Sequence, residues 1–425
     1  MKKVLIVEDS SMVMRVIKHV VKQTSLFQPL YAETLAEAKA VIAEHGSDIF
    51  AAMVDLSLPD APNGEIVDYT LSLKIPTIVL TGSFDSARRE SLLAKGIVDY
   101  VTKEGRFSYL YACNLVHRLI KNESVQVLVV DDSLTSRKII VGMMKLHRYQ
   151  VLEAKDGVEA IKVLLDNPSI KMLITDYNMP RMDGFELVQN LRVKYVKSEL
   201  VIVGISSEGD GHLTARFIKA GANDFIKKPF NHEEFFCRIT HNVEQVEMIE
   251  QIRDAARRDY YTGVYNRYYF FEKGLQDWLA AQEKNTPAAL AVIDLDNFKY
   301  VNETFGNEAG DAVMQQVAQR LDHTLDRFLV ARADGQEFYV LLVGLSNEKA
   351  CALIERMGQL ISSEPAVWDG HKIAVRFSAG VASRVEKTGE DGFDELVNNA
   401  YQCLHRAKDA GGDMIIGDED PADEE

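Results

Sequence analysis

The sequence predicts an α/β protein that begins with two doubly wound parallel-sheet domains and continues into a third domain of different organisation. A strand–loop–helix pattern occurs twice, as KVLIVEDSSMVMRVI from Lys3 and as QVLVVDDSLTSRKII from Gln126. After each copy, short apolar runs alternate with helical patterns, which is typical of a parallel sheet covered by helices. Beyond residue 258 the pattern changes, and FLVA and YVLLV flank an Asp-Gly pair that predicts a hairpin with a tight two-residue turn.

The spacing of the two copies sets the domain boundaries. A repeat of about 120 residues is too long for a solenoid unit and indicates two copies of one domain. The total length of 425 residues fits three domains at roughly 100–200 residues each. We expect two α/β domains, a helical connector, a third domain and an acidic disordered tail at residues 1–122, 124–243, 244–258, 259–417 and 418–425.

Composition excludes several classes of function. The net charge of −16 argues against non-specific binding to DNA or to an anionic membrane surface. No apolar run approaches the roughly 20 residues that span a bilayer, and the N-terminal MKKVLIVEDSS fits a buried strand better than a signal peptide. The four cysteines, Cys113, Cys237, Cys351 and Cys403, are widely spaced. We therefore expect a reduced, cytoplasmic protein without a zinc site, nucleic-acid partner or membrane insertion.

Polar side chains end the apolar runs of both α/β copies. The first copy has Glu8, Asp9, Asp55, Thr81 and Lys103, and the second has, in the same order, Asp131, Asp132, Asp176, Ser206 and Lys228. Because the carboxyl ends of parallel strands meet in one crevice, each set should converge. Clustered carboxylates favour Mg²⁺, and a carboxylate beside Mg²⁺ with a lysine and a hydroxyl is suited to accept a phosphoryl group.

A single acidic residue at a strand end is more often a helix cap or a solvated loop residue. Five polar residues in the same order, twice, disfavour that alternative. Both copies resemble the receiver domains of two-component response regulators. The resemblance implies that Asp55 and Asp176 accept the phosphoryl group from a histidine kinase or a phosphotransfer protein.

The resemblance also assigns the remaining residues of each receiver-like site. In the first copy, Asp9 and the phosphoacceptor would hold Mg²⁺, supported by Glu8 and the backbone carbonyl of Ser57. In the second copy, Asp132, Asp131 and the carbonyl of Asn178 would have the same roles. Thr81 and Ser206 would sense the phosphoryl group, and Tyr100 and Phe225 match the aromatic switch position. The first copy departs from the family in having Lys103-Glu104 where the second keeps Lys228-Pro229, and its loop after Asp55 is one residue longer.

The connector is expected to be helical. Glu233–Arg258 contains neither proline nor glycine, and its apolar residues are spaced close to a heptad seam: Phe236, Ile239, Val243, Val246, Ile249 and Ile252. A stalk that pairs in a homodimer and an ordinary helix packed on its own domain both fit this spacing, and the spacing favours the stalk.

The third domain carries several separated motifs. DYYTGVYNR opens it, AVIDLDNFKYVNETFGNEAGDAV and the hairpin RADGQEF follow, and a helix ends in CLHRAKDAGGD. Together they resemble the GGDEF domain, an α+β fold of the nucleotidyl cyclase type that makes cyclic di-GMP from two GTP molecules with Mg²⁺. The order of domains is that of PleD-like regulators. The resemblance implies metal binding by Asp294 and the Leu295 carbonyl, guanine recognition by Asn302 and Asp311, and phosphate contacts from Lys299 and Lys408.

The signature motif itself is altered. The family's Gly-Gly-Asp/Glu-Glu-Phe is here Asp334, Gly335, Gln336, Glu337 and Phe338. Gln336 replaces a metal-binding carboxylate, and losing several kcal/mol of charge stabilisation slows a reaction about a hundredfold or more. Asp334 adds an anion where a triphosphate should lie. In the closing helix, His405, Gly412 and Asp413 replace a Tyr and an Arg-Asn pair, and Leu325–Phe328 lacks the family's inhibitory Arg-x-x-Asp site.

Three functions remain open. The favoured one is a regulator without turnover, in which the third domain acts on a partner such as a cyclic di-GMP enzyme or another effector protein. The second is an active diguanylate cyclase in which Asp334 or Glu337 replaces the missing carboxylate. The third is a sensor that binds GTP without converting it.

Overall fold

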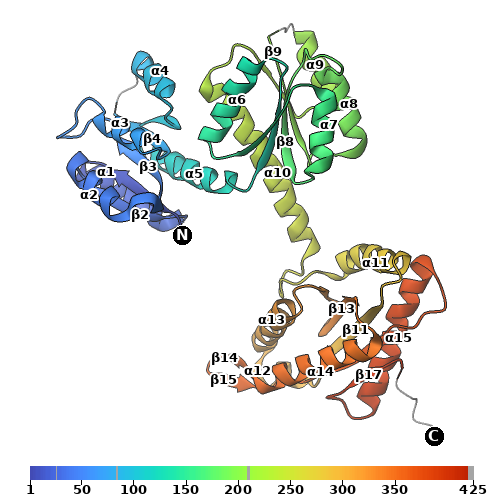
Figure 1. The fold of residues 1–425 in the computed structure, drawn as a ribbon. Helices are drawn as coiled ribbons and strands as arrows, with labels where there is room; N and C mark the ends of the chain where they lie inside the picture. Colours follow the sequence, from blue (N-terminus) through green and yellow to red (C-terminus); the bar gives the residue numbers. More distant parts are fainter. Residues whose placement is uncertain (25, 83–84, 208–210, 420–425) are drawn as a thin grey trace. The chain divides into compact units, whose positions relative to one another are not determined.

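The computed structural model describes residues 1–24, 26–82, 85–207 and 211–419, in two compact units, Met1–Met248 and Ile249–Glu425 (Figure 1). Residues 420–425 of the expected acidic tail lie outside the described residues. Asp418, which we assigned to that tail, belongs to the third domain, because its carboxylate accepts hydrogen bonds from Asn347 Nδ2 at 2.6 Å and Ser383 N at 2.7 Å.

The first α/β domain is a parallel sheet in the order β2-β1-β3-β4-β5 with helices on both faces (Figure 1). Its elements are β1 (Lys3–Val7), α1 (Ser11–Thr24), β2 (Gln28–Ala32), α2 (Leu35–His45), the 3₁₀ turn Gly46–Asp48, β3 (Ile49–Asp55), α3 (Glu65–Ser72), β4 (Thr77–Thr81), α4 (Ser86–Lys95), β5 (Asp99–Thr102) and α5 (Arg106–Asn122). Alternate residues of β1 face opposite layers: Val4 and Ile6 pack with α1 and α5, whereas Leu5 and Val7 pack with α2 and α3.

The second α/β domain repeats this architecture with the sheet order β7-β6-β8-β9-β10. Its elements are β6 (Gln126–Val130), α6 (Leu134–Leu146), β7 (Gln150–Ala154), α7 (Gly157–Asp166), β8 (Ile170–Asp176), α8 (Gly184–Lys194), β9 (Val201–Ser206), α9 (Gly211–Ala220), β10 (Asp224–Lys227) and α10 (His232–Arg257). The carboxyl ends of β6 and β8 lie together at one edge of the sheet, as the sequence predicts.

Helix α10 confirms the expected helical connector. Phe236, Ile239, Val243 and Val246 are buried against the second α/β domain. Ile249 and Ile252 are 39% and 62% exposed, although they continue the same apolar spacing. The helix therefore extends beyond its own domain, and the apolar side chains of this extension are exposed.

The third domain is a mostly antiparallel sheet in the order β12-β13-β11-β16-β17, with a separate small hairpin. Its elements are α11 (Arg267–Glu283), β11 (Ala288–Leu295), α12 (Phe298–Phe305), α13 (Asn307–Thr324), β12 (Leu329–Arg332), β13 (Glu337–Val343), α14 (Asn347–Ser363), β14 (Ala366–Trp368), β15 (His371–Ile373), β16 (Phe377–Ala382), α15 (Gly389–Asp409) and β17 (Ile415–Gly417). Helices α13 and α14 cover one face of the sheet, and α11 and α15 cover the other.

The hairpin between β12 and β13 turns one residue later than the expected Asp334-Gly335 pair. Ala333 N donates to Glu337 O at 2.8 Å and Glu337 N donates to Asp334 O at 2.8 Å, so the turn is centred on Gly335 and Gln336. Gly335 has φ +52°, a left-handed conformation that glycine adopts without strain. Arg332 fixes this geometry, because its Nε and NH2 donate to Gly335 O at 3.1 and 2.8 Å.

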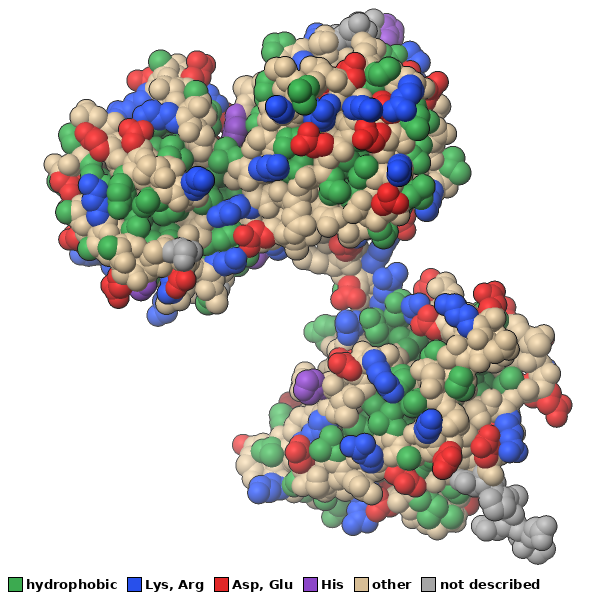
Figure 2. All heavy atoms as spheres, viewed as in Figure 1, with side chains coloured by type: hydrophobic (Ala, Val, Ile, Leu, Met, Phe, Trp, Pro, Cys, Tyr) green, Lys and Arg blue, Asp and Glu red, His purple; other side chains and the backbone are tan. Residues whose placement is uncertain are grey.

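Charged side chains of both signs are interspersed over the visible faces of both units (Figure 2). Among the described residues, none of the helices combines the length and apolar character needed to cross a bilayer.

Candidate functional sites

In the first α/β domain, the predicted polar residues converge at the ends of β1, β3 and β5. Lys103 Nζ lies 2.7 Å from Glu8 Oε2 and 2.7 Å from Asp55 Oδ2. The Glu8 side chain is fully buried and that of Asp55 is 9% exposed, so the ammonium group neutralises two carboxylates in a poorly solvated place. Asp9 stands exposed beside them.

The three carboxylates Glu8, Asp9 and Asp55 fit a magnesium ion. Each offers an oxygen, and these oxygens lie within 4.8 Å of one another; among the described residues no other group of three or more His, Cys, Asp or Glu meets this criterion. Asp9 makes no hydrogen bond or ion pair with any described residue, so its oxygens remain available. Oxygen ligands of this kind suit Mg²⁺.

The second α/β domain brings its predicted polar residues together in a similar way. Lys228 Nζ donates to Asp176 Oδ1 at 2.7 Å and to Asp131 Oδ2 at 2.9 Å, and Asp132 is exposed beside them. Ser136, which the sequence analysis missed, joins this network: its hydroxyl donates to Asp131 Oδ2 at 2.6 Å and accepts from Lys228 Nζ at 2.9 Å. In the first copy Val13 occupies the equivalent place in the repeat and cannot make these bonds.

Burial shifts the pKa values of these groups. It raises the pKa of Glu8 and of Asp176 above the usual range, and hydrogen bonds from Lys103 and Lys228 limit the rise. Burial also lowers the pKa of Lys103 and Lys228, but their carboxylate partners outweigh it and raise both lysine pKa values overall. Both lysines are therefore firmly cationic at neutral pH.

Backbone groups complete the two crevices. Ser57 N donates to Asp55 Oδ1 at 3.3 Å, and Asn178 N donates to Asp176 Oδ2 at 2.9 Å. Lys103 N and Lys228 N each donate, at 2.7 Å, to the carbonyl of the hydroxyl residue on the neighbouring strand, Thr81 or Ser206. These bonds bring the hydroxyl and the lysine of each site to adjacent strand ends.

A glycine fixes the loop after Asp176. A Cβ atom on Gly184 would lie 2.2 Å from the carbonyl oxygen of Asp176, closer than any side chain could approach. Gly184 N also donates to Tyr177 O at 2.9 Å, which closes the loop onto the strand end. The close approach of this loop to Asp176 therefore requires glycine.

The predicted switch residues Tyr100 and Phe225 are 6% and 5% exposed. Tyr100 lines a groove of about 710 Å³ together with Phe236 of α10. At this groove Arg89 Nε donates to Glu233 Oε1 at 2.7 Å, and nearby Arg118 NH1 lies 2.6 Å from Glu247 Oε1. These ion pairs between α10 and helices α4 and α5 could not be predicted from the sequence.

In the third domain, Asp294 at the end of β11 is 2% exposed and both of its oxygens have partners. Lys408 Nζ donates to Asp294 Oδ2 at 2.6 Å, and Gln336 Nε2 donates to Asp294 Oδ1 at 3.2 Å. A carboxylate at position 336 could not donate this bond. The altered motif therefore changes the surroundings of the proposed metal ligand from a second anion to a neutral donor.

Glu337 is the cross-strand partner of Asp294, and its surroundings were not foreseen. Tyr401 OH donates to Glu337 Oε2 at 2.8 Å and lies 2.8 Å from Tyr339 OH. Burial raises the pKa of Glu337; the bond from Tyr401 limits the rise and the charge of Asp294 adds to it. Tyr401 lies on α15, far from the motif in sequence.

Asp334 points away from this cluster. Its Oδ2 lies 2.7 Å from Arg267 NH1, in an ion pair whose side chains are 55% and 78% exposed. Asp296, the other carboxylate that follows β11, accepts from Ser378 Oγ at 2.8 Å and from Asp413 N at 3.0 Å. Neither carboxylate therefore replaces the one missing at position 336.

The predicted nucleotide residues lie on two neighbouring helices and at the end of α15. Asn302 is on α12 and Asp311 is on α13, and a Cβ atom on Gly310 would lie 1.9 Å from Asn302 Oδ1, so Gly310 leaves room for that side chain. Lys299 is 88% exposed and reaches only Glu303, at 3.7 Å. Leu295 N donates to Gln336 O at 3.4 Å, and the Leu295 side chain is buried.

Comparison with known proteins identifies two of the domains. The family model for the diguanylate cyclase GGDEF domain matches residues 256–414, and the model for the response regulator receiver domain matches residues 127–240. The response regulator PleD of Caulobacter vibrioides is 25% identical over 305 residues, which cover 69% of this chain and 65% of PleD. The chain thus spans about two thirds of that relative.

Two further relatives are more similar over shorter lengths. A chemotaxis protein CheY homolog of Campylobacter jejuni is 43% identical over 107 residues, covering 25% of this chain and 82% of the homolog. A crystal structure of a two-component system response regulator/GGDEF domain protein is 42% identical, with a TM-score of 0.54, and covers 58% of this chain and 100% of its own. The chain belongs to the response regulators that combine a receiver domain with a GGDEF domain.

Proposed function

We propose that this protein is a response regulator with two receiver domains, phosphorylated on Asp55, Asp176 or both with Mg²⁺. The observation that carries the proposal is the pair of lysine-bridged carboxylate sites, Lys103 with Glu8 and Asp55, and Lys228 with Asp131 and Asp176. Two independent copies of this arrangement in one chain indicate retained chemistry.

The residues have distinct tasks in this reaction. A carboxylate oxygen of Asp55 or Asp176 attacks the phosphorus of the donor, and the bond to the leaving group breaks. Bound Mg²⁺ would be held by the acidic residues of each site and would neutralise the charge of the transferring group. The lysine, already within 2.7 Å of the phosphoacceptor, would move its bond to a phosphoryl oxygen. The hydroxyl of Thr81 or Ser206 would donate a hydrogen bond to another phosphoryl oxygen.

We propose that the third domain transmits this signal without making cyclic di-GMP. Gln336 and Lys408 occupy both oxygens of Asp294, and Tyr401 holds Glu337. A neutral amide is a weak ligand for Mg²⁺ compared with a carboxylate. The domain would then act by contact with a protein partner, such as a cyclic di-GMP enzyme or another effector.

The connector would carry the signal as a homodimer. The exposed Ile249 and Ile252 continue the buried seam of α10, so pairing of two stalks would cover them. Sedimentation of the full chain tests this, because Ile249→Lys with Ile252→Lys should shift the protein toward monomer. An unchanged dimer in that variant would place the contact elsewhere.

One observation favours an active cyclase as the second candidate. Asp294 and Glu337 are cross-strand neighbours, and their mutual repulsion contributes to the raised pKa of Glu337. Two adjacent carboxylates could share a cation if Lys408 moved away. A sensor that binds GTP through Asn302 and Asp311 without turnover remains compatible with the same geometry.

Phosphoryl incorporation tests the receiver assignment. The purified chain is incubated with Mg²⁺ and a small phosphoryl donor, and the product is measured by intact mass. We expect incorporation in the wild type, a reduced amount in Asp55→Ala or Asp176→Ala, and none in the double variant. Asp48→Ala, an exposed aspartate in the first domain, is the matched control. Undiminished incorporation in the double variant would refute the site assignment.

GTP turnover separates the functions of the third domain. The chain is incubated with GTP and Mg²⁺ or Mn²⁺, with and without beryllofluoride as a phosphoryl mimic. We expect no cyclic di-GMP above the Asp294→Ala background. Product that disappears in Asp294→Ala would establish the cyclase instead, whereas saturable GTP binding that is lost in Asn302→Ala, without product, would establish the sensor.

A further inference from the structure

The two α/β domains, which form one compact unit, contact each other through α10. Arg89 Nε on α4 donates to Glu233 Oε1 at 2.7 Å, and Arg118 NH1 on α5 lies 2.6 Å from Glu247 Oε1. The groove of about 710 Å³ lies in the same place, lined by β5 and α5 on one side and by α10 on the other. We call this the interdomain contact: α4, β5 and α5 of the first domain against α10 and the α6–β7 turn of the second.

Buried nitrogens without a hydrogen-bond partner are concentrated in the interdomain contact. Among the described residues, the buried side-chain nitrogens that make no hydrogen bond are His117 Nδ1, Arg118 NH2, His147 Nε2, Arg148 Nε and His232 Nε2. All five residues interact with the other α/β domain. Burying a polar atom without a partner costs free energy that water restores on separation, so these atoms weaken the contact.

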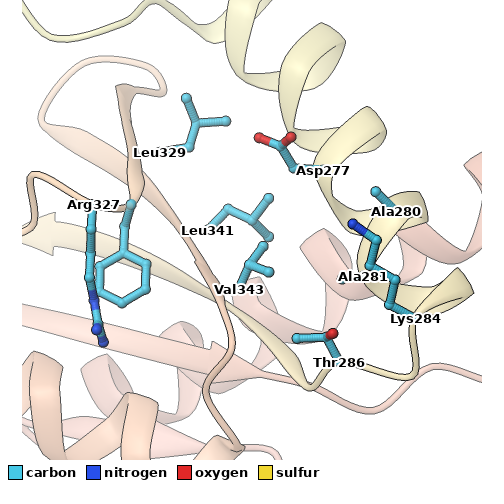
Figure 3. Close-up of a pocket in the computed structure, with 10 residues that line it drawn as sticks. Asp277, Ala280, Ala281, Lys284, Thr286, Arg327, Leu329, Leu341 and Val343 are labelled. Carbon is cyan, nitrogen blue, oxygen red and sulfur yellow. The ribbon is translucent and has the colours of Figure 1, made fainter. Parts of the chain in front are cut away.

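The third domain does not share this feature. Within its described residues no buried side-chain nitrogen or oxygen lacks a partner, and this includes the residues that line its cavity of about 350 Å³ (Figure 3). The unpartnered nitrogens are therefore a property of the place where the two α/β domains meet, and not of the cores of the chain in general.

Two of the five nitrogens belong to neighbouring histidine rings. The ring centres of His147 and His232 lie 5.3 Å apart, and His147 stacks on Phe236 of α10 at 3.4 Å. The His147 ring also bonds to the backbone of Val98, at the start of β5 in the first domain. Because Nε2 has no partner, that bond uses Nδ1, and Asn122 Nδ2 of α5 donates to the His147 carbonyl at 2.9 Å. His147 is thus held between the two domains.

Both rings are neutral while the domains are in contact. Burial lowers the pKa of His147 well below its usual range, and it lowers the pKa of His232 to about 4. A histidine in water has a pKa of about 6.5, so the contribution of the neutral rings is complete above about pH 6.5 and is lost as pH falls toward 4. One pH unit below 6.5, each ring weakens the contact by about tenfold.

The carboxylates of the contact do not produce the same pH dependence. Burial raises the pKa of Asp99 on β5, so its protonation in acid favours the contact and opposes the histidines. Burial also raises the pKa of Glu247, but Arg118 and Lys121 outweigh it and lower this pKa overall. Glu233 is paired with Arg89, and Glu244, which lines the groove, is exposed.

The remaining titratable groups act weakly or outside the acid range. Burial raises the pKa of Tyr111, Cys237 and Tyr149, so these side chains stay protonated and neutral below neutral pH. Burial lowers the pKa of His117, which therefore acts in the same direction as the two rings, although this residue is only half-buried. His241 lines the groove from α10 and is exposed.

We propose that the interdomain contact is pH-sensitive: the neutral rings of His147 and His232 allow the two α/β domains to pack, and protonation of both rings separates α10 from the first domain. Each added proton would otherwise place a cation in a site whose nearest acidic groups are already paired with arginine or lysine. The proposal does not depend on phosphorylation of Asp55 or Asp176.

Zero-length cross-linking of the full chain tests the proposal. A carbodiimide joins a lysine to a carboxylate that touches it. Lys121 and Glu247, 3.1 Å apart across the contact, give one product, and Lys95 and Asp68, 2.7 Å apart within the first domain, give the internal reference. The ratio of the two products, measured by peptide mass spectrometry, corrects for the pH dependence of the reagent. We expect this ratio to fall about tenfold or more between about pH 7.5 and about pH 5.5.

A variant without the two rings separates their effect from that of other groups. His147→Asn, which keeps a donor for the Val98 carbonyl, is combined with His232→Phe, and the cross-link ratio should then be equal at the two pH values. His19→Asn, at an exposed histidine on α1, is the matched control and should behave as the wild type does.

Two results would overturn the proposal: a wild-type ratio that is unchanged between the two pH values, or an equal fall in the double variant. If the double variant does not form the contact at either pH, NMR of ring-labelled histidine in the wild type decides. We expect His147 and His232 to titrate together, at the midpoint of the cross-link loss. Separate titration of the two rings, unrelated to that loss, would show that they do not control the contact.

Discussion

In the two α/β domains a lysine bridges two carboxylates and leaves a third exposed, whereas in the third domain a lysine and an amide occupy both oxygens of one carboxylate. Asp9 and Asp132 stand at the mouths of the first kind of site and make no hydrogen bond or ion pair with described residues. Asp294 has no such companion, because Asp334 pairs with Arg267 and Asp296 is held by Ser378. The first α/β domain thus keeps a carboxylate cluster that fits a metal ion, the second keeps an exposed carboxylate beside its paired set, and the third holds Asp294 in an internal network.

Restoring a carboxylate to the third domain is the strongest way to break this comparison. In Asp334→Gly with Gln336→Glu, the amide donor to Asp294 is replaced by a second anion and the turn regains a neutral first residue. We expect cyclic di-GMP production to rise about a hundredfold or more over the wild type. The Asp334→Gly single variant is the matched control and should remain inactive. A double variant that stays inactive, with GTP binding intact, would place the defect elsewhere, such as at Gly412.

Removing the bridging lysine should cost stability in a receiver site. Lys228→Met leaves Asp131 and Asp176 buried side by side without a cation, and breaking a buried pair in this way costs about 3–5 kcal/mol, with the lower end fitting a lysine that is partly exposed. Urea unfolding measures the change. Lys227→Met, an exposed lysine on β10, is the control. Equal stability of the two variants would mean that the bridge does not hold the site together.

The pH dependence of phosphorylation tests the ion pair between Lys228 and Asp176. Because burial raises the pKa of Asp176, its reactive carboxylate form is lost as pH falls through that raised value. The raised pKa also means that protonation of Asp176 favours the folded state. As pH falls through this range, the free energy of unfolding therefore increases while the rate of phosphorylation declines. In an Asp55→Ala background, Lys228→Met should move the midpoint of the rate profile to higher pH. A midpoint that stays in place would show that Lys228 does not act on Asp176.

The smallest effect is expected at the exposed ion pair of the altered turn. Arg267 and Asp334 are both largely exposed, and such pairs contribute about 0–1 kcal/mol. Asp334→Asn should therefore change the free energy of unfolding by less than Lys228→Met does, and should not start cyclic di-GMP production. A large loss of stability would make this pair a structural element of the hairpin.

The strand-end residues of both α/β domains could be predicted from the sequence, because the strands of a parallel sheet bring their last residues to one edge. The change at Gln336 could also be recognised in the sequence, because the motif around it is contiguous. The roles of Ser136 and Tyr401 could not be predicted, because they depend on how α6 and α15 pack onto the sheets. The turn at Gly335 and Gln336 was misplaced because Arg332, outside the turn, fixes its geometry.

Counting bound Mn²⁺ in the absence of nucleotide tests the contrast between the two kinds of site most directly. Paramagnetic titration of the wild type should show binding that is lost in Asp55→Asn with Asp176→Asn and unchanged in Asp294→Asn. Loss of a bound ion in Asp294→Asn, with Asp55 and Asp176 unchanged, would contradict the account, because it would show that the third domain still offers an open metal site.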